Sequence, residues 1–470
     1  MIMQFKKSCW MVWAALMICC CSLSECAVAE TTSAETTKRA ERLVMLVSID
    51  GLGGYYLDDA KAEMPTLRRL AAEGVRAAGM KASAPTVTWP NHTTMMTGVH
   101  PARHGVLGNN YLDRATRRKV TLLWDPVLDM AEIVRAPTIF DVAKERGMTT
   151  AAVRWPATRN AGTLDWNVPD VGTYEHLRQF STPVLHDALR AAGVELDGDA
   201  DDPRGQKFTP TDVNWTKVMR HVLREHRPEL ALFHLVDVDH IEHADGPRSR
   251  EAYAAIKQAD EHLRMVVDDA KELYPGGVSV VVVSDHGFSP IVRGILPNVV
   301  LREAGLIEEN DGEVVGGDVE VVGQGGSALV YVLDDVRRVE IVDKIKQAFA
   351  EVEGVDKVVG VEEFGAYGIP DPQDDPHAPD VILFAGMGYN FGDTTAGAIP
   401  FEVKPERKGS HGHDPNLPEL KATFVAWGKG VRRGVEIPEV ENTCVAPTLA
   451  RLLGIEMAGC DGAAVEAALE

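Results

Sequence analysis

The sequence predicts an α/β protein with a doubly wound, mainly parallel sheet flanked by helices, and a smaller inserted α+β subdomain. Apolar runs of strand length alternate with amphipathic runs of helical length along most of the chain, as in parallel sheets whose strands are connected by helices. Acidic residues follow several of the apolar runs. Between residues 291 and 400 the pattern changes to short alternating runs and glycine-rich turns, which indicates a separate substructure.

The first strand–helix unit is clear. Residues 42–49 (RLVMLVSI) are almost continuously apolar, which is typical of a parallel strand buried on both faces. Asp50 follows directly. Residues 64–75 have helical spacing, with Pro65 suited to the first turn and Gly74 to the end of a helix.

The same alternation continues to residue 283 and returns near the C-terminus. We expect strands over 149–153, 230–236, 278–283 and 422–427, helices over 138–146, 216–224, 251–273 and 446–453, and, inside the subdomain, a strand over 328–333 and a helix over 339–351. Ligands of such sheets bind beyond the carboxyl ends of the strands. Asp50, Asp239 and Asp285 fall at such ends.

The expected domain organisation follows from these elements. At 470 residues the chain is long enough for a large core and a subdomain. We expect the core to comprise residues 41–290 and 401–470, and the inserted subdomain to comprise residues 291–400.

The N-terminus resembles a secretory leader. Lys6 and Lys7 precede an apolar run over 9–23, and Ala27-Val28-Ala29 has the form of a signal-peptidase site. We therefore expect residues 1–29 to be a signal peptide, followed by a linker over 30–40, and the protein to be periplasmic or secreted.

Two membrane alternatives bear on that expectation. The apolar run is shorter than the roughly 20 residues of a membrane span, and no later segment is longer and equally apolar, so no transmembrane helix is expected. Leu23 to Cys26 resembles a lipid-attachment box, although Glu25 is unfavourable there. Lipid anchoring is the less favoured alternative.

Cysteine content and charge narrow the choice of partners. Five of the seven cysteines lie in the leader, leaving Cys444 and Cys460, which form either one disulfide or two buried thiols. The net charge of -22 argues against a nucleic acid as a bulk partner, because that needs clustered Lys and Arg. A small phosphorylated substrate would be bound locally, with the help of a cation.

Six residues are candidate metal ligands. Each alone has a simpler explanation: Asp239 and His243 could lie on a solvated helix face, a strand-end Asp often caps a loop, and a lone His is more often structural. Together they offer three carboxylates and three imidazoles, enough for two ions with N and O ligands: Asp50, Asp239, His243, Asp285, His286 and His411.

Thr88 is the candidate nucleophile. It lies at an expected strand-to-helix junction, before Pro90, where a threonine also serves as a helix N-cap. A threonine hydroxyl needs activation to attack at neutral pH, and two cations roughly 4 Å apart would provide it.

Seven elements in order resemble one family, the nucleotide pyrophosphatase/phosphodiesterase branch of the alkaline phosphatase superfamily. The resemblance covers residues 43–453. Its elements are Ile49-Asp50-Gly51, Thr88-Trp89-Pro90-Asn91-His92, Thr97-Gly98 with His104-Gly105, Trp155-Pro156, Asp239-x-x-x-His243-x-x-Gly246-Pro247, Asp285-His286-Gly287 and His411-Gly412.

The resemblance implies an alkaline phosphatase-like fold and a hydrolase with two Zn²⁺, other divalent cations being possible, that forms a covalent phosphothreonine at Thr88. It implies one metal site of Asp239, His243 and His411, and a second of Asp50, Thr88, Asp285 and His286. It also implies that Asn91 contacts a phosphoryl oxygen. Sulfatase relatives are disfavoured, because they need a modifiable Cys or Ser at position 88.

Departures from the family pattern leave the substrate open. Trp89 replaces a usual phenylalanine, and His234 and His413 replace usual tyrosines, so a base-stacking platform is in doubt. We expect Trp89, Asn91, His234 and Trp155 to contact the substrate.

Two alternatives to a phosphodiesterase remain. One is a phosphomonoesterase or phosphonate hydrolase on the same scaffold. A cationic side chain touching the transferred phosphate would favour the monoesterase, and Arg154 and Lys408 are the candidates. A non-catalytic binding protein is disfavoured, because all six ligands and Thr88 are present.

Overall fold

The computed structural model describes residues 40–123, 128–194, 212–311, 313–392, 400–402 and 406–470. The expected signal peptide, most of the linker and the lipid-attachment alternative lie outside these residues. The chain from residue 39 onward forms one compact unit. None of its described helices combines the length and the hydropathy of a membrane span.

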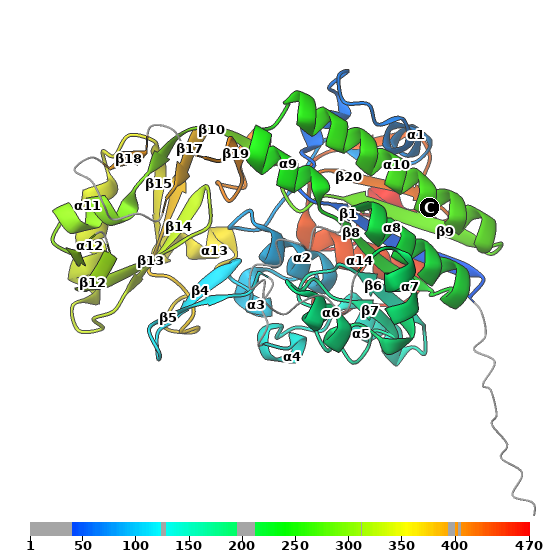
Figure 1. Ribbon diagram of the computed structural model, residues 1–470, viewed down its shortest axis with the longest axis horizontal. Helices are drawn as coiled ribbons and strands as arrows, with labels where there is room; N and C mark the ends of the chain where they lie inside the picture. Colours follow the sequence, from blue (N-terminus) through cyan, green and yellow to red (C-terminus); the bar gives the residue numbers. More distant parts are fainter. Residues whose placement is uncertain (1–39, 124–127, 195–211, 312, 393–399, 403–405) are drawn as a thin grey trace, which may run out of the picture. The chain divides into compact units, whose positions relative to one another are not determined.

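An eight-stranded sheet forms the core of the larger part of this unit, on the right in Figure 1. Five neighbouring pairs are parallel, and β20 runs antiparallel to both of its neighbours. The sheet is therefore mainly parallel, as expected. Its order is β21 (Val435–Ile437), β2 (Val75–Ala77), β20 (Phe424–Gly428), β9 (Gly277–Val283), β1 (Arg42–Ile49), β8 (Leu230–Leu235), β6 (Thr150–Val153) and β7 (Trp166–Val168).

Strand β1 contains the apolar run over residues 42–49, and its position in the sheet explains why that run is apolar on both faces. Alternate side chains of a strand point to opposite faces of the sheet. Leu43, Met45 and Val47 join one hydrophobic cluster, and Val44 and Leu46 join another. The central strand is therefore buried from both sides.

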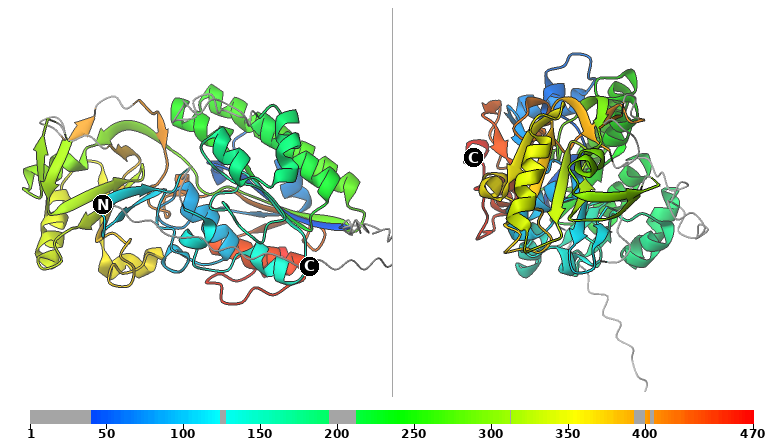
Figure 2. Two further views of the ribbon diagram at one scale, coloured as in Figure 1. Left: turned by 60° about the horizontal axis from the view of Figure 1, so that its bottom comes forward. Right: turned by 90° about the vertical axis from the view of Figure 1, so that its left-hand side faces the viewer.

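Helices cover both faces (Figure 2). The first cluster includes side chains from α1 (Pro65–Glu73), α8 (Asp212–His221) and α10 (Arg250–Leu273). The second includes side chains from α2 (Thr88–Thr97), α5 (Ile139–Glu145) and α14 (Val445–Leu453). The doubly wound arrangement predicted from the alternation is confirmed.

Most expected elements are present within a few residues of their predicted bounds. The helix expected over 216–224 starts four residues earlier and continues as a π-helical turn, Val222–His226. The antiparallel direction of β20 was not expected, because strand direction depends on where a connection crosses the sheet.

Cys444 and Cys460 are free thiols.

A second, antiparallel sheet lies within residues 291–400. Its order is β13 (Val319–Gly323), β14 (Ser327–Val332), β16 (Val381–Ala385) and β15 (Val355–Gly360). Helix α12 (Arg338–Phe349) packs with it in a hydrophobic cluster whose buried members run from Ile295 to Phe391. The exact division into a core and an inserted subdomain stays a prediction.

Smaller elements connect this second sheet to the helical layer. Strand β10 (Ser289–Ile295) pairs with β17 (Gly388–Phe391), β18 (Phe401–Glu402) and β19 (Gly409–Ser410). A hairpin of β4 (Asn110–Asp113) and β5 (Arg118–Thr121) contacts β13.

The two-sided burial of β1 leads to a stability prediction. Val47→Ala removes two buried carbons from a fully buried side chain and should lower the free energy of unfolding by about 2 kcal/mol. The matched control Val336→Ala, at a position 96% exposed, should leave it nearly unchanged. Denaturant unfolding followed by circular dichroism would measure both, and equal effects would contradict the assignment of β1 to the core.

Candidate active site

The candidate ligands lie at one edge of the large sheet because three neighbouring strands end there. Strands β9, β1 and β8 are parallel and in register, with Ser48 beside Val283 and Ile49 beside Leu235. Asp50 follows β1, and Asp285 and His286 follow β9. Such an edge is where ligands of α/β sheets bind.

The other ligands come from a helix and a loop. Helix α9 (Asp237–Asp245) begins two residues after β8 and carries Asp239 and His243 one turn apart. His411 directly follows β19. The helical turn predicted for the Asp-x-x-x-His segment is therefore present.

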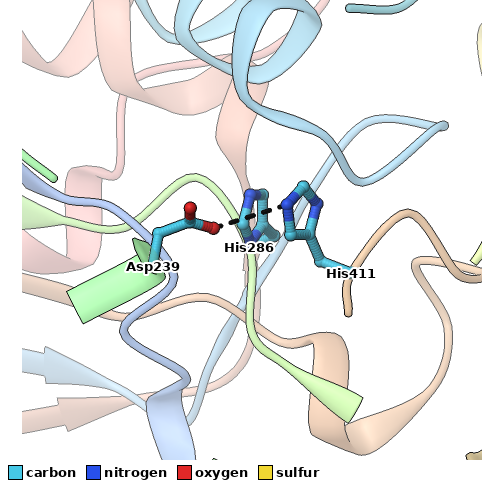
Figure 3. A group of neighbouring side chains, drawn as sticks. All are labelled: Asp239, His286 and His411. Carbon is cyan, nitrogen blue, oxygen red and sulfur yellow. Dashed lines mark ion pairs between the residues drawn. The ribbon is translucent and has the colours of Figure 1, made fainter. Parts of the chain in front are cut away.

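One group of candidate ligands consists of Asp239, His286 and His411 (Figure 3). Their ligand atoms all lie within 4.8 Å of one another, and all three residues are buried. Asp239 Oδ1 lies 3.4 Å from His411 Nε2 and 3.5 Å from His243 Nε2. His243 therefore borders the same group.

A second group consists of Asp50, Asp285 and His286, again with ligand atoms within 4.8 Å. His286 belongs to both groups, and its ring stacks on that of His411 with centroids 3.7 Å apart. All six ligands predicted from the sequence are thus brought together, with His286 central to them.

The hydrogen bonds of the imidazoles favour a cation. The Nδ1 atoms of His243, His286 and His411 lie 3.0–3.1 Å from the backbone carbonyl oxygens of Gly409, Gly287 and Thr86. A carbonyl oxygen can only accept, so each Nδ1 carries the proton and each Nε2 presents a lone pair.

These lone pairs face other acceptors. The Nε2 atoms of His243 and His411 are 3.1 Å apart. Among the described residues, Asp50 Oδ1, Asp239 Oδ1, Asp285 Oδ2 and His286 Nε2 are buried without a hydrogen-bond partner. Buried acceptors without donors are unfavourable, and a bound cation would satisfy them. The residues present therefore fit a pair of divalent cations with N and O ligands.

The electrostatics agree with this interpretation. Burial raises the pKa of Asp50, and the nearby charges of Asp285 and Asp239 raise it further. Burial lowers the pKa of His411, as do the neighbouring His286 and His243. A bound cation would lower the pKa of Asp50 and would lower the pKa of His411 further, so it would favour the forms of both groups that bind a metal, the carboxylate and the neutral imidazole.

Thr88 begins helix α2 and lines the same cavity as Asp50, Asp239 and His411. Its side chain is only 7% exposed. His92, one turn later, contacts the Thr88 carbonyl through Nδ1 at 2.9 Å and the Ser48 hydroxyl through Nε2 at 2.9 Å. Both nitrogens of His92 are therefore used within the protein.

The structure corrects the expectation for Asn91. This residue is fully buried, its Oδ1 accepts from the Ser83 amide, and its Nδ2 donates to the carbonyls of Val87 and Pro85. The Asn91 side-chain amide stabilises the turn before α2 through these hydrogen bonds. It does not line the cavity that Thr88 lines.

Asn109 lies where Asn91 was expected. It lines the cavity, and its Oδ1 accepts from the amide of Trp89. Its backbone amide donates to the side chain of Gln324. Nothing in the local sequence distinguished Asn109, because it reaches Thr88 only through the fold of the β4–β5 hairpin.

Two aromatic residues expected to contact substrate lie in the core instead. Trp89 is 4% exposed and packs in the second hydrophobic cluster, as does the fully buried Trp155. Neither lines the cavity, whereas His234 does. Large apolar side chains at these positions are more favourable in the hydrophobic layer behind α2 than in a polar cavity.

The cavity has a volume of about 540 Å³. Arg154 and Asp170 line it and form an ion pair at 2.6 Å, both nearly fully buried. Lys408, the other candidate cation, pairs with Asp245 and does not line the cavity, while the neighbouring Arg407 does. Most of the lining residues are thus polar or charged, and Phe391 is the only Phe, Tyr or Trp among the lining residues that the structure describes.

The ligand geometry leads to a metal-binding prediction. After removal of metal by a chelator, the protein should bind two divalent cations per chain, and His243→Ala should bind one at the same free concentration because it loses an Nε2 ligand. His221→Ala, at a partly exposed histidine of α8 that is not among the residues lining the cavity, is the matched control and should bind two. Equilibrium dialysis with metal analysis would measure this, and two ions in His243→Ala would contradict the ligand assignment.

Comparisons with known proteins agree with this geometry. A family model described as type I phosphodiesterase / nucleotide pyrophosphatase matches residues 44–414. Mouse ectonucleotide pyrophosphatase/phosphodiesterase family member 1 is 22% identical over 419 residues, which cover 87% of this chain and 40% of the relative. An uncharacterized pyrophosphatase/phosphodiesterase of Schizosaccharomyces pombe is 24% identical over 434 residues, covering 88% and 77%. The chain spans 40% or less of the length of the first three relatives.

Solved structures share the fold. Human ectonucleotide pyrophosphatase/phosphodiesterase 5 superposes with a TM-score of 0.66 at 19% identity, covering 91% of this chain and 97% of that one. An inactive threonine-to-alanine variant of the murine protein, in complex with AMP, gives 0.69 at 17% identity, covering 92% and 100%. The family model matches more than three quarters of the residues of this chain. The chain therefore belongs to the type I phosphodiesterase/nucleotide pyrophosphatase family.

Proposed function

We propose that this chain is an exported, two-zinc phosphodiesterase or nucleotide pyrophosphatase that acts through a covalent phosphothreonine at Thr88. The observation that carries the proposal is that Thr88 lines one cavity with Asp239 and His411 of the first group and with Asp50 of the second. Asp239, His243 and His411 would hold one ion, and Asp50, Thr88, Asp285 and His286 the other. Bound zinc would lower the pKa of the Thr88 hydroxyl and neutralise charge on the phosphoryl group.

The chain's own groups define the course of the reaction. The Thr88 oxygen attacks phosphorus and gives up its proton to water, while the bond from phosphorus to the leaving oxygen breaks and the leaving alcohol takes a proton from water. Asn109 lines the cavity, and its Nδ2 would donate to a phosphoryl oxygen while its Oδ1 accepts from the Trp89 amide. Water then hydrolyses the phosphothreonine and regenerates Thr88.

Two of the comparisons support parts of this proposal. The murine relative solved with AMP is an inactive threonine-to-alanine variant, which is consistent with a threonine nucleophile and a nucleotide-like substrate. Relatives are described as ectonucleotide pyrophosphatases and venom phosphodiesterases, which, with the leader-like N-terminus, supports export.

A phosphomonoesterase or phosphonate hydrolase is the second candidate. The observation that favours it is Arg154, a nearly buried cation that lines the cavity. Its ion pair with Asp170 reduces the net positive charge available to a second phosphate oxygen, so we rank the diesterase first.

Removal of the Thr88 hydroxyl tests the nucleophile. Thr88→Ala should lose on the order of 10³-fold or more in turnover of an aryl phosphodiester while still binding metal through Asp50, Asp285 and His286. Thr88→Ser, which keeps a hydroxyl, is the control and should retain measurable turnover. Mass spectrometry of acid-quenched enzyme should find a phosphorylated Thr88 peptide, and activity retained in Thr88→Ala would refute the assignment.

A substrate comparison separates the two candidate functions. The purified protein should have a higher kcat/KM for an aryl phosphodiester or a dinucleotide than for an aryl phosphomonoester, because Arg154 is paired with Asp170 rather than left to bind a dianion. Steady-state kinetics on the three substrates with the same leaving group where possible would measure this. A preference for the monoester would favour the second candidate.

A further inference from the structure

We propose that Gln324 is a positioning residue for Asn109. Its side-chain amide pairs with the backbone of Asn109 and Asn110, and this pairing holds the Asn109 side chain with Nδ2 available to the cavity that Thr88 lines. The inference rests on the proposed function, in which that Nδ2 donates to a phosphoryl oxygen. It gives the turn between β13 and β14, which belongs to the second sheet, a role in the reaction.

The donors and acceptors of this contact follow from the backbone groups involved. The N–H of Asn109 can only donate, and it lies 2.9 Å from Gln324 Oε1. The carbonyl oxygen of Asn110 can only accept, and it lies 2.7 Å from Gln324 Nε2. One amide group thus forms two hydrogen bonds with consecutive residues. Gln324 is 5% exposed, so water competes little for these hydrogen bonds.

The Asn109 side chain is oriented by a backbone group as well. Its Oδ1 accepts from the Trp89 amide at 3.0 Å, one of the first amides of α2, which have no carbonyl partner within the helix. The Asn109 carbonyl accepts from the Leu122 amide at 2.8 Å. Within the described part of the chain, Nδ2 is therefore the polar group of Asn109 left to donate to a ligand in the cavity.

The turn that carries Gln324 is held by backbone contacts. The Gln324 amide donates to the Ser327 carbonyl at 2.8 Å, and the Gly326 amide donates to the His411 carbonyl at 2.7 Å. A Cβ at Gly412 would overlap the carbonyl oxygen of Gln324, so the turn lies directly against the loop that follows His411. These contacts remain when the Gln324 side chain is changed.

The space for the Gln324 amide depends on a glycine. A Cβ at Gly108 would lie 2.8 Å from Gln324 Nε2 and 2.7 Å from the Asn110 carbonyl oxygen. A side chain at position 108 would therefore displace the amide from its partners. The residue before Asn109 leaves room for this pairing because it has no side chain.

A donor to a phosphoryl oxygen is effective only when it is aimed correctly. Loss of one such donor costs about 10²- to 10³-fold in kcat, and a displacement of about 1 Å can cost on the order of 10²-fold. Without the Gln324 amide, Asn109 keeps its contact with Trp89 but loses the one that fixes its backbone amide. We therefore expect a smaller loss than for removal of the Asn109 side chain.

A double-mutant cycle with an aryl phosphodiester tests the inference. Asn109→Ala should lower kcat/KM about 10²- to 10³-fold. Gln324→Met, which keeps a side chain of similar length but removes both hydrogen bonds, should lower it about 10- to 100-fold. In the Asn109→Ala background, Gln324→Met should have almost no further effect, because no donor is left to position. Gln347→Met, at an exposed position of α12, is the matched control and should equal wild type.

Hydrogen exchange followed by mass spectrometry gives a readout that does not depend on activity or metal. In metal-free Gln324→Met, peptides covering residues 107–112 should lose protection, because the Asn109 amide has lost its acceptor. Peptides from α10 should exchange as in wild type, which also shows that the variant is folded. Unchanged protection of residues 107–112 would overturn the inference.

The outcomes separate this inference from the proposed function. If wild type turns over neither aryl phosphate esters nor a dinucleotide, the proposed function fails and takes the inference with it. If wild type is active but Asn109→Ala or Gln324→Met keeps its kcat/KM, only the inference fails.

The cycle also distinguishes positioning from a direct contact, since Gln324 itself lines the cavity. An equal loss from Gln324→Met with and without the Asn109 side chain would make Gln324 a substrate contact and overturn the positioning role. Should Gln324→Met not fold, Gln324→Ala takes its place in the same cycle and is judged by the same criteria.

Discussion

The arrangement of this protein depends on one electrostatic constraint: three carboxylates and three imidazole lone pairs converge in a buried space with too few protons to satisfy them. The Nε2 atoms of His243 and His411 face each other at 3.1 Å, and four ligand atoms lack a hydrogen-bond partner among the described residues. In a folded protein such acceptors are costly unless a donor or cation is present. The rest of the site is best understood as the means of holding them there.

The scaffold holds them through elements that do not depend on the metal. Strands β9, β1 and β8 end in register, so Asp285, His286 and Asp50 emerge together. Each of the three imidazoles is oriented by a backbone carbonyl on its Nδ1 side. The ligands are therefore oriented by strands and backbone hydrogen bonds, which favours binding because little conformational freedom remains to be lost.

The cavity next to these ligands is lined mostly by polar and charged residues. Trp89 and Trp155 are used in the hydrophobic layer rather than in the cavity, and the walls carry the Arg154–Asp170 pair, Arg407 and several amide groups. A substituent bound there would be held more by hydrogen bonds and charge than by stacking between aromatic rings. The polar lining therefore favours testing substrates with polar groups and does not identify a single substrate.

By itself, the sequence determined the α/β alternation, the bounds of most core elements and the six candidate ligands with Thr88, because hydrophobic periodicity and short motifs are local properties of the chain. The environments of Asn91, Asn109 and His234 were decided only by the tertiary structure. Asn91 and Asn109 are both asparagines near Thr88, yet backbone groups before α2 surround one and the β4–β5 hairpin carries the other into the cavity. His234 meets Asp50 only because β8 lies beside β1. Such pairings depend on which segments fold side by side, and no local spacing in the chain encodes them.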